Sequence, residues 1–103
     1  MTDGPPLARP AALLLDDRDT AAVALVPLKA GIEVEIRRGG GVVKVVTDGF
    51  IPFGHKLAVS AMAAGAPVVK YGEVIGFATT DICPGQHVHV HNVRSDRAKL
   101  SDA

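Results

Sequence analysis

Apolar residues in this chain come in short stretches that glycine, proline and polar residues interrupt every few positions. β-Branched residues crowd two of these stretches, residues 41–47 and 86–93, as is typical of strands. A helical spacing of apolar residues is confined to residues 19–25 and 56–64, where it predicts a short helix or a single turn. The pattern therefore predicts a mainly β domain of short strands and tight turns, with one or two short helices.

The two ends of the chain differ from this pattern. Residues 1–12 contain three prolines and predict a disordered arm, and residues 94–103 predict a polar tail. We therefore expect one folded domain over residues 13–93, which suits a chain of 103 residues with 48% hydrophobic content. A domain this small buries only about 60–65% of the surface of its unfolded chain, so it has little stability to spare for a deep active site of its own.

A short degenerate repeat organises the domain: an apolar residue, any residue, Ala or Pro, Gly, two further residues and Val. Its copies are residues 28–34 (LKAGIEV), 62–68 (MAAGAPV) and 82–88 (ICPGQHV). Ala or Pro followed by Gly suits a type II turn, because glycine takes the positive φ of the third turn position without strain. The uneven spacing of the copies argues against a stacked solenoid. We expect turns that each lead into a strand, and we call these segments hooks.

Charge and cysteine content narrow the function classes. The chain has 11 basic and 11 acidic residues and no basic stripe interleaved with aromatics, which argues against nucleic acid or a membrane surface as a partner. The single cysteine, Cys83, cannot form an intramolecular disulfide and fits a reducing compartment. The first residues lack the basic segment and apolar core of a secretory signal, so we expect a cytoplasmic protein.

Three of the four histidines alternate with valine in residues 86–92 (QHVHVHN). In an extended strand this alternation places His87, His89 and His91 on one face. Such a row can bind a metal, move protons or hold an anion, and the alternative is a polar face whose imidazoles only bond to their neighbours. Strand residues two apart lie roughly 6.5 Å apart, and residues four apart about 13 Å. We therefore expect at most two adjacent histidines to share one ion.

A second polar segment, residues 49–56 (GFIPFGHK), predicts a tight loop that a proline and Gly54 constrain. The loop presents His55 and Lys56 at its exit. A lysine charge and a histidine proton carrier are what recognition or deprotonation of a hydroxy acid requires, and the alternative is an exposed turn with a solvated lysine. Residues 70–73 (KYGE) by spacing alone predict a hairpin turn with a Lys–Glu pair. No nucleophile elbow, phosphate loop or paired-cysteine zinc motif supports catalysis by this chain alone.

Taken in order, three of these segments resemble the SAF domain of the altronate and galactarate dehydratase family. They are residues 51–56 (IPFGHK), 70–76 (KYGEVIG) and 85–92 (GQHVHVHN), and the resemblance covers residues 19–93. It implies a β-clip fold, a small set of twisted hairpins. In that family the domain either precedes a large catalytic domain or is a separate small subunit, as in sulfolactate sulfo-lyase. We expect the small-subunit form, with residues 94–103 in the place of the interdomain linker.

The resemblance also implies a function. Enzymes of the family eliminate water or sulfite from a hydroxy acid such as altronate, galactarate or sulfolactate, and they depend on a divalent metal, Fe²⁺ or Mn²⁺. The implied partners are a large catalytic dehydratase-type subunit and the small hydroxy-acid substrate, and self-association stays open. The implied site residues are His55, Lys56, His89 and His91 for catalysis, Gly54, Tyr71 and Asn92 for substrate binding, and His87 and His89 for the metal.

Two other functions remain open at this point. A stand-alone SAF domain that binds carbohydrate or protein without catalysis would explain the fold, although it would not need the row of histidines. A metal-binding β-domain of cupin type ranks last, because the usual glutamate ligand is missing from the histidine segment.

Overall fold

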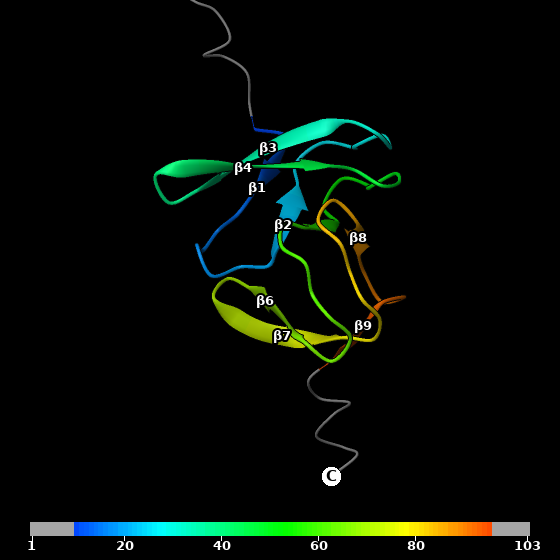
Figure 1. Cartoon of the computed structure of the whole chain (residues 1–103). Helices are drawn as coiled ribbons and strands as arrows, with labels where there is room; N and C mark the ends of the chain where they lie inside the picture. The colour runs from blue at the N-terminus through cyan, green and yellow to red at the C-terminus, as the bar shows by residue number, and fades with distance from the viewer. Residues whose placement is uncertain (1–9, 96–103) are drawn as a thin grey trace, which may run out of the picture.

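The computed structural model describes residues 10–95, which form nine short strands and no helix (Figure 1). The strands are β1 (Ala12–Leu13), β2 (Ala21–Ala24), β3 (Glu33–Arg38), β4 (Gly41–Val46), β5 (Lys56–Ala58), β6 (Pro67–Lys70), β7 (Glu73–Ala78), β8 (His87–Val88) and β9 (Val93–Ser95). No segment of this described part is a helix long and apolar enough to cross a membrane. The prediction of a mainly β domain is confirmed.

The prediction of one or two short helices is wrong. Both segments expected to be helical contain strands, β2 and β5, and these two strands pair with each other in antiparallel register. Alanine-rich sequence favours a helix only weakly, and tertiary pairing overrides such a preference. Here Ala21 pairs with Ala58 and Ala22 with Leu57, all of them buried.

All strand pairs are antiparallel and fall into three sheets. The central sheet has the order β1-β2-β5-β8, the second is the hairpin β3-β4, and the third has the order β6-β7-β9. In Figure 1 the β3–β4 hairpin lies at one end of the molecule and the β6–β7 hairpin at the other. The ordered strands begin at Ala12 and end at Ser95, slightly outside the expected domain of residues 13–93. The rest of the expected arm and tail lies outside the described residues.

The three hooks that the sequence predicted are confirmed, and the structure adds a fourth. Gly31, Gly65 and Gly85 have φ values of 81°, 89° and 92°, as a type II turn requires, and a strand follows each of them. Residues 51–57 (IPFGHKL) form the same turn, with Gly54 at φ 83°. In chain order the hooks are therefore residues 28–34, 51–57, 62–68 and 82–88, and we number them first to fourth.

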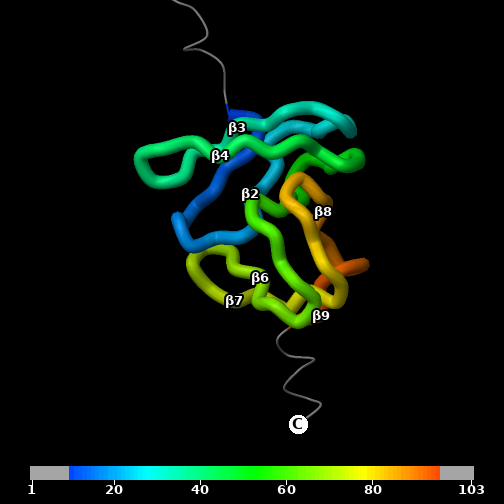
Figure 2. The backbone as a smooth tube through the Cα atoms, in the orientation of Figure 1, coloured from blue at the N-terminus to red at the C-terminus, as the bar shows by residue number. Residues whose placement is uncertain are grey.

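The hooks associate in two reciprocal pairs. Leu28 of the first hook exchanges two backbone hydrogen bonds with Ile51 of the second, and Met62 of the third does the same with Ile82 of the fourth. Figure 2 shows the chain after β5 running beside the chain that leads into β8, where the second of these pairs forms. The domain thus consists of two similar halves, each built on one pair of hooks.

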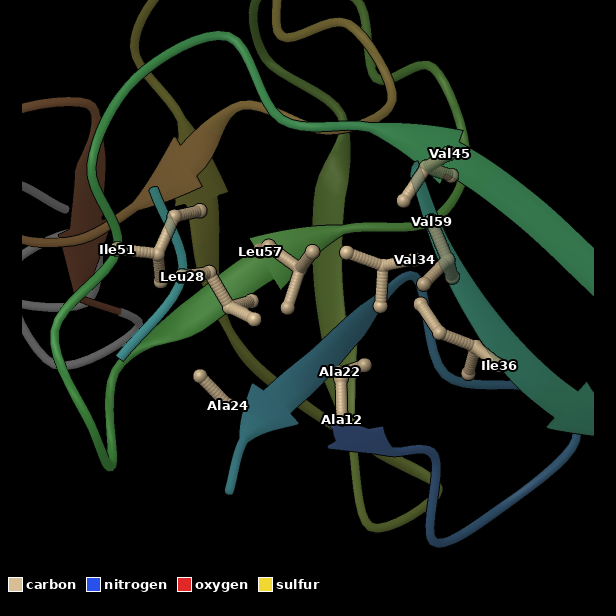
Figure 3. Packing of buried hydrophobic residues seen from close by; sticks show 10 residues of the cluster. All are labelled: Ala12, Ala22, Ala24, Leu28, Val34, Ile36, Val45, Ile51, Leu57 and Val59. Carbon is tan, nitrogen blue, oxygen red and sulfur yellow. The ribbon is translucent and has the colours of Figure 1, made fainter. Parts of the chain in front are cut away.

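Each hook pair has its own hydrophobic cluster. The first cluster contains Leu28 and Ile51, which lie next to each other in Figure 3. Its buried members are Ala12, Ala22, Ala24, Leu28, Val34, Ile36, Val45, Ile51, Leu57 and Val59. The second cluster consists of Ala21, Ala58, Met62, Val68, Ala78, Ile82 and Val88. Because β5 contributes Leu57 to one cluster and Ala58 to the other, this strand joins the two halves.

Candidate functional site

The pairing of β5 with β8 brings the second and fourth hooks together. Lys56 pairs with Val88 and Leu57 with His87, so His55, one residue before β5, faces the chain just after β8. The backbone of His55 is held on both sides, since its N–H donates to the carbonyl of Pro52 and its carbonyl accepts from Ala24 N–H. The two polar segments that the sequence singled out therefore meet at one place, at the junction between the two halves.

The alternation of histidine and valine predicted one continuous strand over the histidine segment. This prediction is wrong. Strand β8 ends at Val88, and residues 89–92 form a turn that the N–H of Asn92 closes on the carbonyl of His89 at 3.0 Å. Val90 therefore leaves the buried face of Val88 and is 82% exposed. Alternation of polar and apolar residues predicted a strand because it carries no signal for a turn closed by a side chain further along.

The turn nevertheless gathers the imidazoles. His55 Nδ1 lies 2.9 Å from His87 Nε2, within hydrogen-bond distance. The ring of His89 lies 4.4 Å from that of His55 and 5.3 Å from that of His87, and the ring of His91 lies 5.3 Å from that of His87. The expected separation of about 13 Å between His87 and His91 is wrong, because the chain reverses between them. We call these four residues the histidine cluster.

Three members of the cluster are placed to share an ion. Ligand nitrogens of His55, His87 and His89 all lie within 4.8 Å of one another, and they form the group with metal-binding geometry in the described part of the chain. His55 thus joins the two residues, His87 and His89, that were predicted as metal ligands. Imidazole nitrogen suits iron, zinc and other transition metals, so this donor set fits a divalent ion of that class.

The environment of two members of the histidine cluster, His87 and His89, favours their neutral form. Partial burial, followed by the positive charge that His55 can carry, lowers the pKa of His87 below its ordinary value of 6.5. Desolvation, followed by the charges of His55 and Lys56, also lowers the pKa of His89. Neutral imidazole is the form that binds a metal or accepts a proton, so both residues keep these capacities at neutral pH.

The side chain of Asn92 stabilises the turn of residues 89–92, which we call the histidine turn. Its side-chain carbonyl accepts a hydrogen bond from the N–H of His89 at 2.9 Å, and its amide donates to the carbonyl of His87 at 2.8 Å. The residue is only 6% exposed. Because both ends of its amide are engaged within the turn, the geometry supports a positioning role rather than the predicted contact with substrate. Asparagine is common in turns for this reason, and that propensity was the available sequence signal.

A pocket of about 220 Å³ lies beside the cluster; His89 belongs to both, and Lys56 also lines the pocket. The rest of its wall includes Ile75, Val88, Val90 and Val93. Sequence analysis did not find this wall, because Ile75 comes from β7 and reaches the site only through the pairing of β7 with β9. The arrangement offers one cation at the edge of a small apolar recess, next to imidazoles that can bind an ion or move a proton.

The structure places Gly54 and Tyr71 differently with respect to this site. Gly54 directly precedes His55 and links the second hook to β2 by donating its N–H to the carbonyl of Ala24. Tyr71 lies at the turn between β6 and β7, which Figure 1 shows on the opposite side of the molecule from β8. Its ring packs under Lys70 Nζ at 3.4 Å, and the turn is tied to the N-terminal loop by Gly72 N–H donating to Asp19. Tyr71 is therefore not brought to the histidine cluster.

Comparisons with known proteins identify a family and relatives of this chain. The family model for the altronate/galactarate dehydratase SAF domain matches residues 10–96. Altronate dehydratase of Escherichia coli K12 is 43% identical over 82 residues, which cover 80% of this chain and 16% of that protein. The (2R)-sulfolactate sulfo-lyase subunit alpha of Chromohalobacter salexigens is 49% identical over 47 residues, 46% of this chain and 50% of that protein.

A second (2R)-sulfolactate sulfo-lyase subunit alpha, from Paracoccus pantotrophus, is also 49% identical over 47 residues, 46% of this chain and 70% of that protein. The chain therefore spans a small part of the altronate dehydratase and half of the Chromohalobacter subunit. Since the family model matches well over half of its residues, the chain belongs to the altronate/galactarate dehydratase SAF domain family.

Proposed function

We propose that this domain contributes the histidine cluster and Lys56 to the active site of a lyase, and that a larger polypeptide completes that site. The reaction is elimination of water or sulfite from a small hydroxy acid. One observation carries the proposal: the second hook, the fourth hook and the turn after the fourth hook bring four imidazoles together beside the pocket that Lys56 lines. The names of the relatives, a dehydratase and a sulfo-lyase subunit, support the reaction class.

The side chains match the needs of such an elimination. A group must bind the carboxylate, a base must take the proton next to it, and an acid must assist the leaving group. The Lys56 ammonium is the carboxylate-binding group in this proposal, because it is the cation on the pocket wall. His91 is the proton carrier in this proposal, because His55, His87 and His89 form the group of converging nitrogens that can hold an ion. His87 and His89 would hold a divalent ion, Fe²⁺ or Mn²⁺. The ion would supply Lewis acidity that stabilises the enediolate charge.

The need for a partner follows from the shape of the site. Its pocket is small, and its wall is mostly aliphatic, so the described residues offer few hydrogen-bond partners for the hydroxyl groups of a substrate. A deep active site closes around its substrate and excludes water, which this open recess beside a surface turn does not do. A dehydratase-type large subunit would supply the remaining walls, as the relative named subunit alpha suggests.

The test reconstitutes this chain with a dehydratase-type large polypeptide and assays altronate, galactarate and sulfolactate under anoxic conditions with Fe²⁺. Formation of a 2-keto acid or release of sulfite is measured. We expect no turnover by the chain alone, turnover by the complex, and at least about a 100-fold loss with His89→Ala, because this variant loses a ligand of the ion. Cys83→Ser, at an exposed position on the fourth hook, is the matched control and keeps full activity. Turnover by the lone chain, or full activity of the His89→Ala complex, contradicts the proposal.

A further inference from the structure

We propose that this domain by itself binds one divalent transition-metal ion through His55, His87 and His89, before any larger polypeptide is present. The inference rests on the proposed function for its biological purpose. It goes further in one respect, because the proposed function does not require the small domain alone to hold the ion. It also names His55, from the second hook, as the third ligand.

The backbone already places the three ligands. His55 is fixed by two backbone hydrogen bonds, through its N–H to Pro52 and through its carbonyl from Ala24. The carbonyl of His87 and the N–H of His89 are both bonded to the side chain of Asn92. Since all three backbones are held, forming the site requires only rotation of imidazole rings about their side-chain bonds. Such preorganisation is what raises metal affinity in small sites.

The distances between the imidazole nitrogens are short enough for all three to reach one ion. Two imidazole nitrogens bound to one ion at 2.0–2.1 Å with a tetrahedral angle lie about 3.3 Å apart. His55 Nδ1 and His87 Nε2 are 2.9 Å apart with a shared hydrogen between them, and the nitrogen of His89 lies within 4.8 Å of both. On binding, the shared hydrogen moves to the other nitrogen of its ring, and the ion takes its place. His89 then swings inward by a distance that ring rotation allows.

The donor set selects the class of ion. The three ligands are neutral imidazoles, and no carboxylate or thiolate of the described residues joins them in the group. Nitrogen donors favour Zn²⁺, Co²⁺ or Fe²⁺, whereas Mg²⁺ and Ca²⁺ require oxygen ligands. Three protein ligands also leave at least one coordination position open, which is the arrangement of catalytic sites. The ion keeps its full double charge and can attract a carboxylate together with Lys56.

The experiment uses the purified, metal-free full chain without any partner. Co²⁺ is titrated while its visible absorption is recorded, and Zn²⁺ and Mg²⁺ are titrated by calorimetry. We expect one Co²⁺ or Zn²⁺ per chain, no binding of Mg²⁺, and the ligand-field spectrum of a nitrogen-rich site. His55→Gln, His87→Gln and His89→Gln are each expected to weaken Co²⁺ binding by at least about 10- to 100-fold.

His91→Gln is the matched control, because its ring belongs to the cluster but not to the group of converging nitrogens. It is expected to change the affinity less than about 3-fold, which corresponds to well under 1 kcal/mol. Circular dichroism confirms that each variant is folded, and a variant that is not folded is replaced by the corresponding asparagine variant. Absence of Co²⁺ and Zn²⁺ binding by the folded chain overturns the inference. Equal losses with His91→Gln and His55→Gln overturn the assignment of the ligands.

The experiments distinguish a failure of this inference from a failure of the proposed function. If the lone chain binds no ion but the complex turns over a hydroxy acid, this inference fails and the lyase proposal stands. If the lone chain binds the ion as described and the complex converts none of the three acids, the lyase proposal fails and the metal site stands.

Discussion

A comparison of two hook glycines tests how the fourth hook is held. Gly31 and Gly85 occupy equivalent turn positions, with φ values of 81° and 92°. A Cβ atom added at Gly31 would meet nothing within 4 Å, whereas one added at Gly85 would overlap the carbonyl oxygen of Val46. The substitutions Gly31→Ala and Gly85→Ala therefore share the cost of the left-handed backbone and differ in this one contact.

The shared cost is about 1–2 kcal/mol, the penalty of an L-residue in the left-handed region. The contact adds a further 1–3 kcal/mol or more at Gly85, as overpacking does in well-packed cores. Val46 cannot simply move away, because it pairs with Glu33 in the β3–β4 hairpin and the carbonyl of Gly85 is bonded to Asp48 N–H. We expect Gly85→Ala to destabilise the domain by about 2 kcal/mol more than Gly31→Ala, a 30-fold difference in the folding equilibrium.

Urea unfolding followed by circular dichroism measures the difference. With an m-value of about 1–2 kcal/mol/M for a small domain, the midpoint for Gly85→Ala should lie about 1–2 M below that for Gly31→Ala. A Gly85→Ala chain that is already unfolded without urea agrees with the same reasoning, provided that Gly31→Ala remains folded. Equal midpoints, or a lower midpoint for Gly31→Ala, would show that the close approach of the fourth hook to β4 does not hold.

Three further predictions concern the candidate site. Asn92→Ala removes both hydrogen bonds that hold the histidine turn from a buried position, so the free energy of unfolding should fall by about 2–3 kcal/mol. Asp81→Ala, which removes one exposed bond to Ala64 N–H, should cost less than about 1 kcal/mol, and equal losses for the two variants contradict the positioning role of Asn92. The lowered pKa of His87 means that the unfolded chain binds more protons than the native chain just below the ordinary pKa of 6.5. The free energy of unfolding should therefore decline as the pH falls from about 7.5 through the folded-state pKa. His87→Gln should flatten this decline in urea unfolding measured at several pH values. An unchanged slope would show that His87 is not the group responsible. In the reconstituted enzyme, Lys56→Met should raise KM for the acid by about 10-fold or more, the size of a lost charged contact, and an unaltered KM excludes Lys56 as the carboxylate-binding group.

The sequence predicted the turns of this fold better than its strands. Glycine after alanine or proline has a specific backbone consequence, so Gly31, Gly65 and Gly85 could be read locally. The repeat pattern did not include the second hook, because Phe53 stands in the place of Ala or Pro and Leu57 in the place of Val. The backbone of this hook is nevertheless the same. Its pairing with the first hook depends on a bridge between residues far apart in the sequence, which no local pattern reveals.

The candidate site was predicted in its membership more than in its geometry. The alternating histidines and the separate pair His55 and Lys56 were identified from residue type, and the pairing of β5 with β8 then joined them. The turn at His89 could not be predicted from alternation, because the side chain of Asn92 decides it. The distance of Tyr71 from the histidine cluster could not be predicted for a related reason. A motif places a residue along the chain, whereas the direction of the β6–β7 hairpin decides on which side of the molecule its turn lies.

The reciprocal pairing of hooks has a consequence for cooperativity. The residues that converge at the site come from the second hook in one half and from the fourth hook and its following turn in the other. Anything bound between them ties the two halves into a single folding unit. Its binding should slow amide hydrogen exchange not only near the imidazoles but also at the distant N–H groups of Leu28 and Met62, which would open only when the whole domain does.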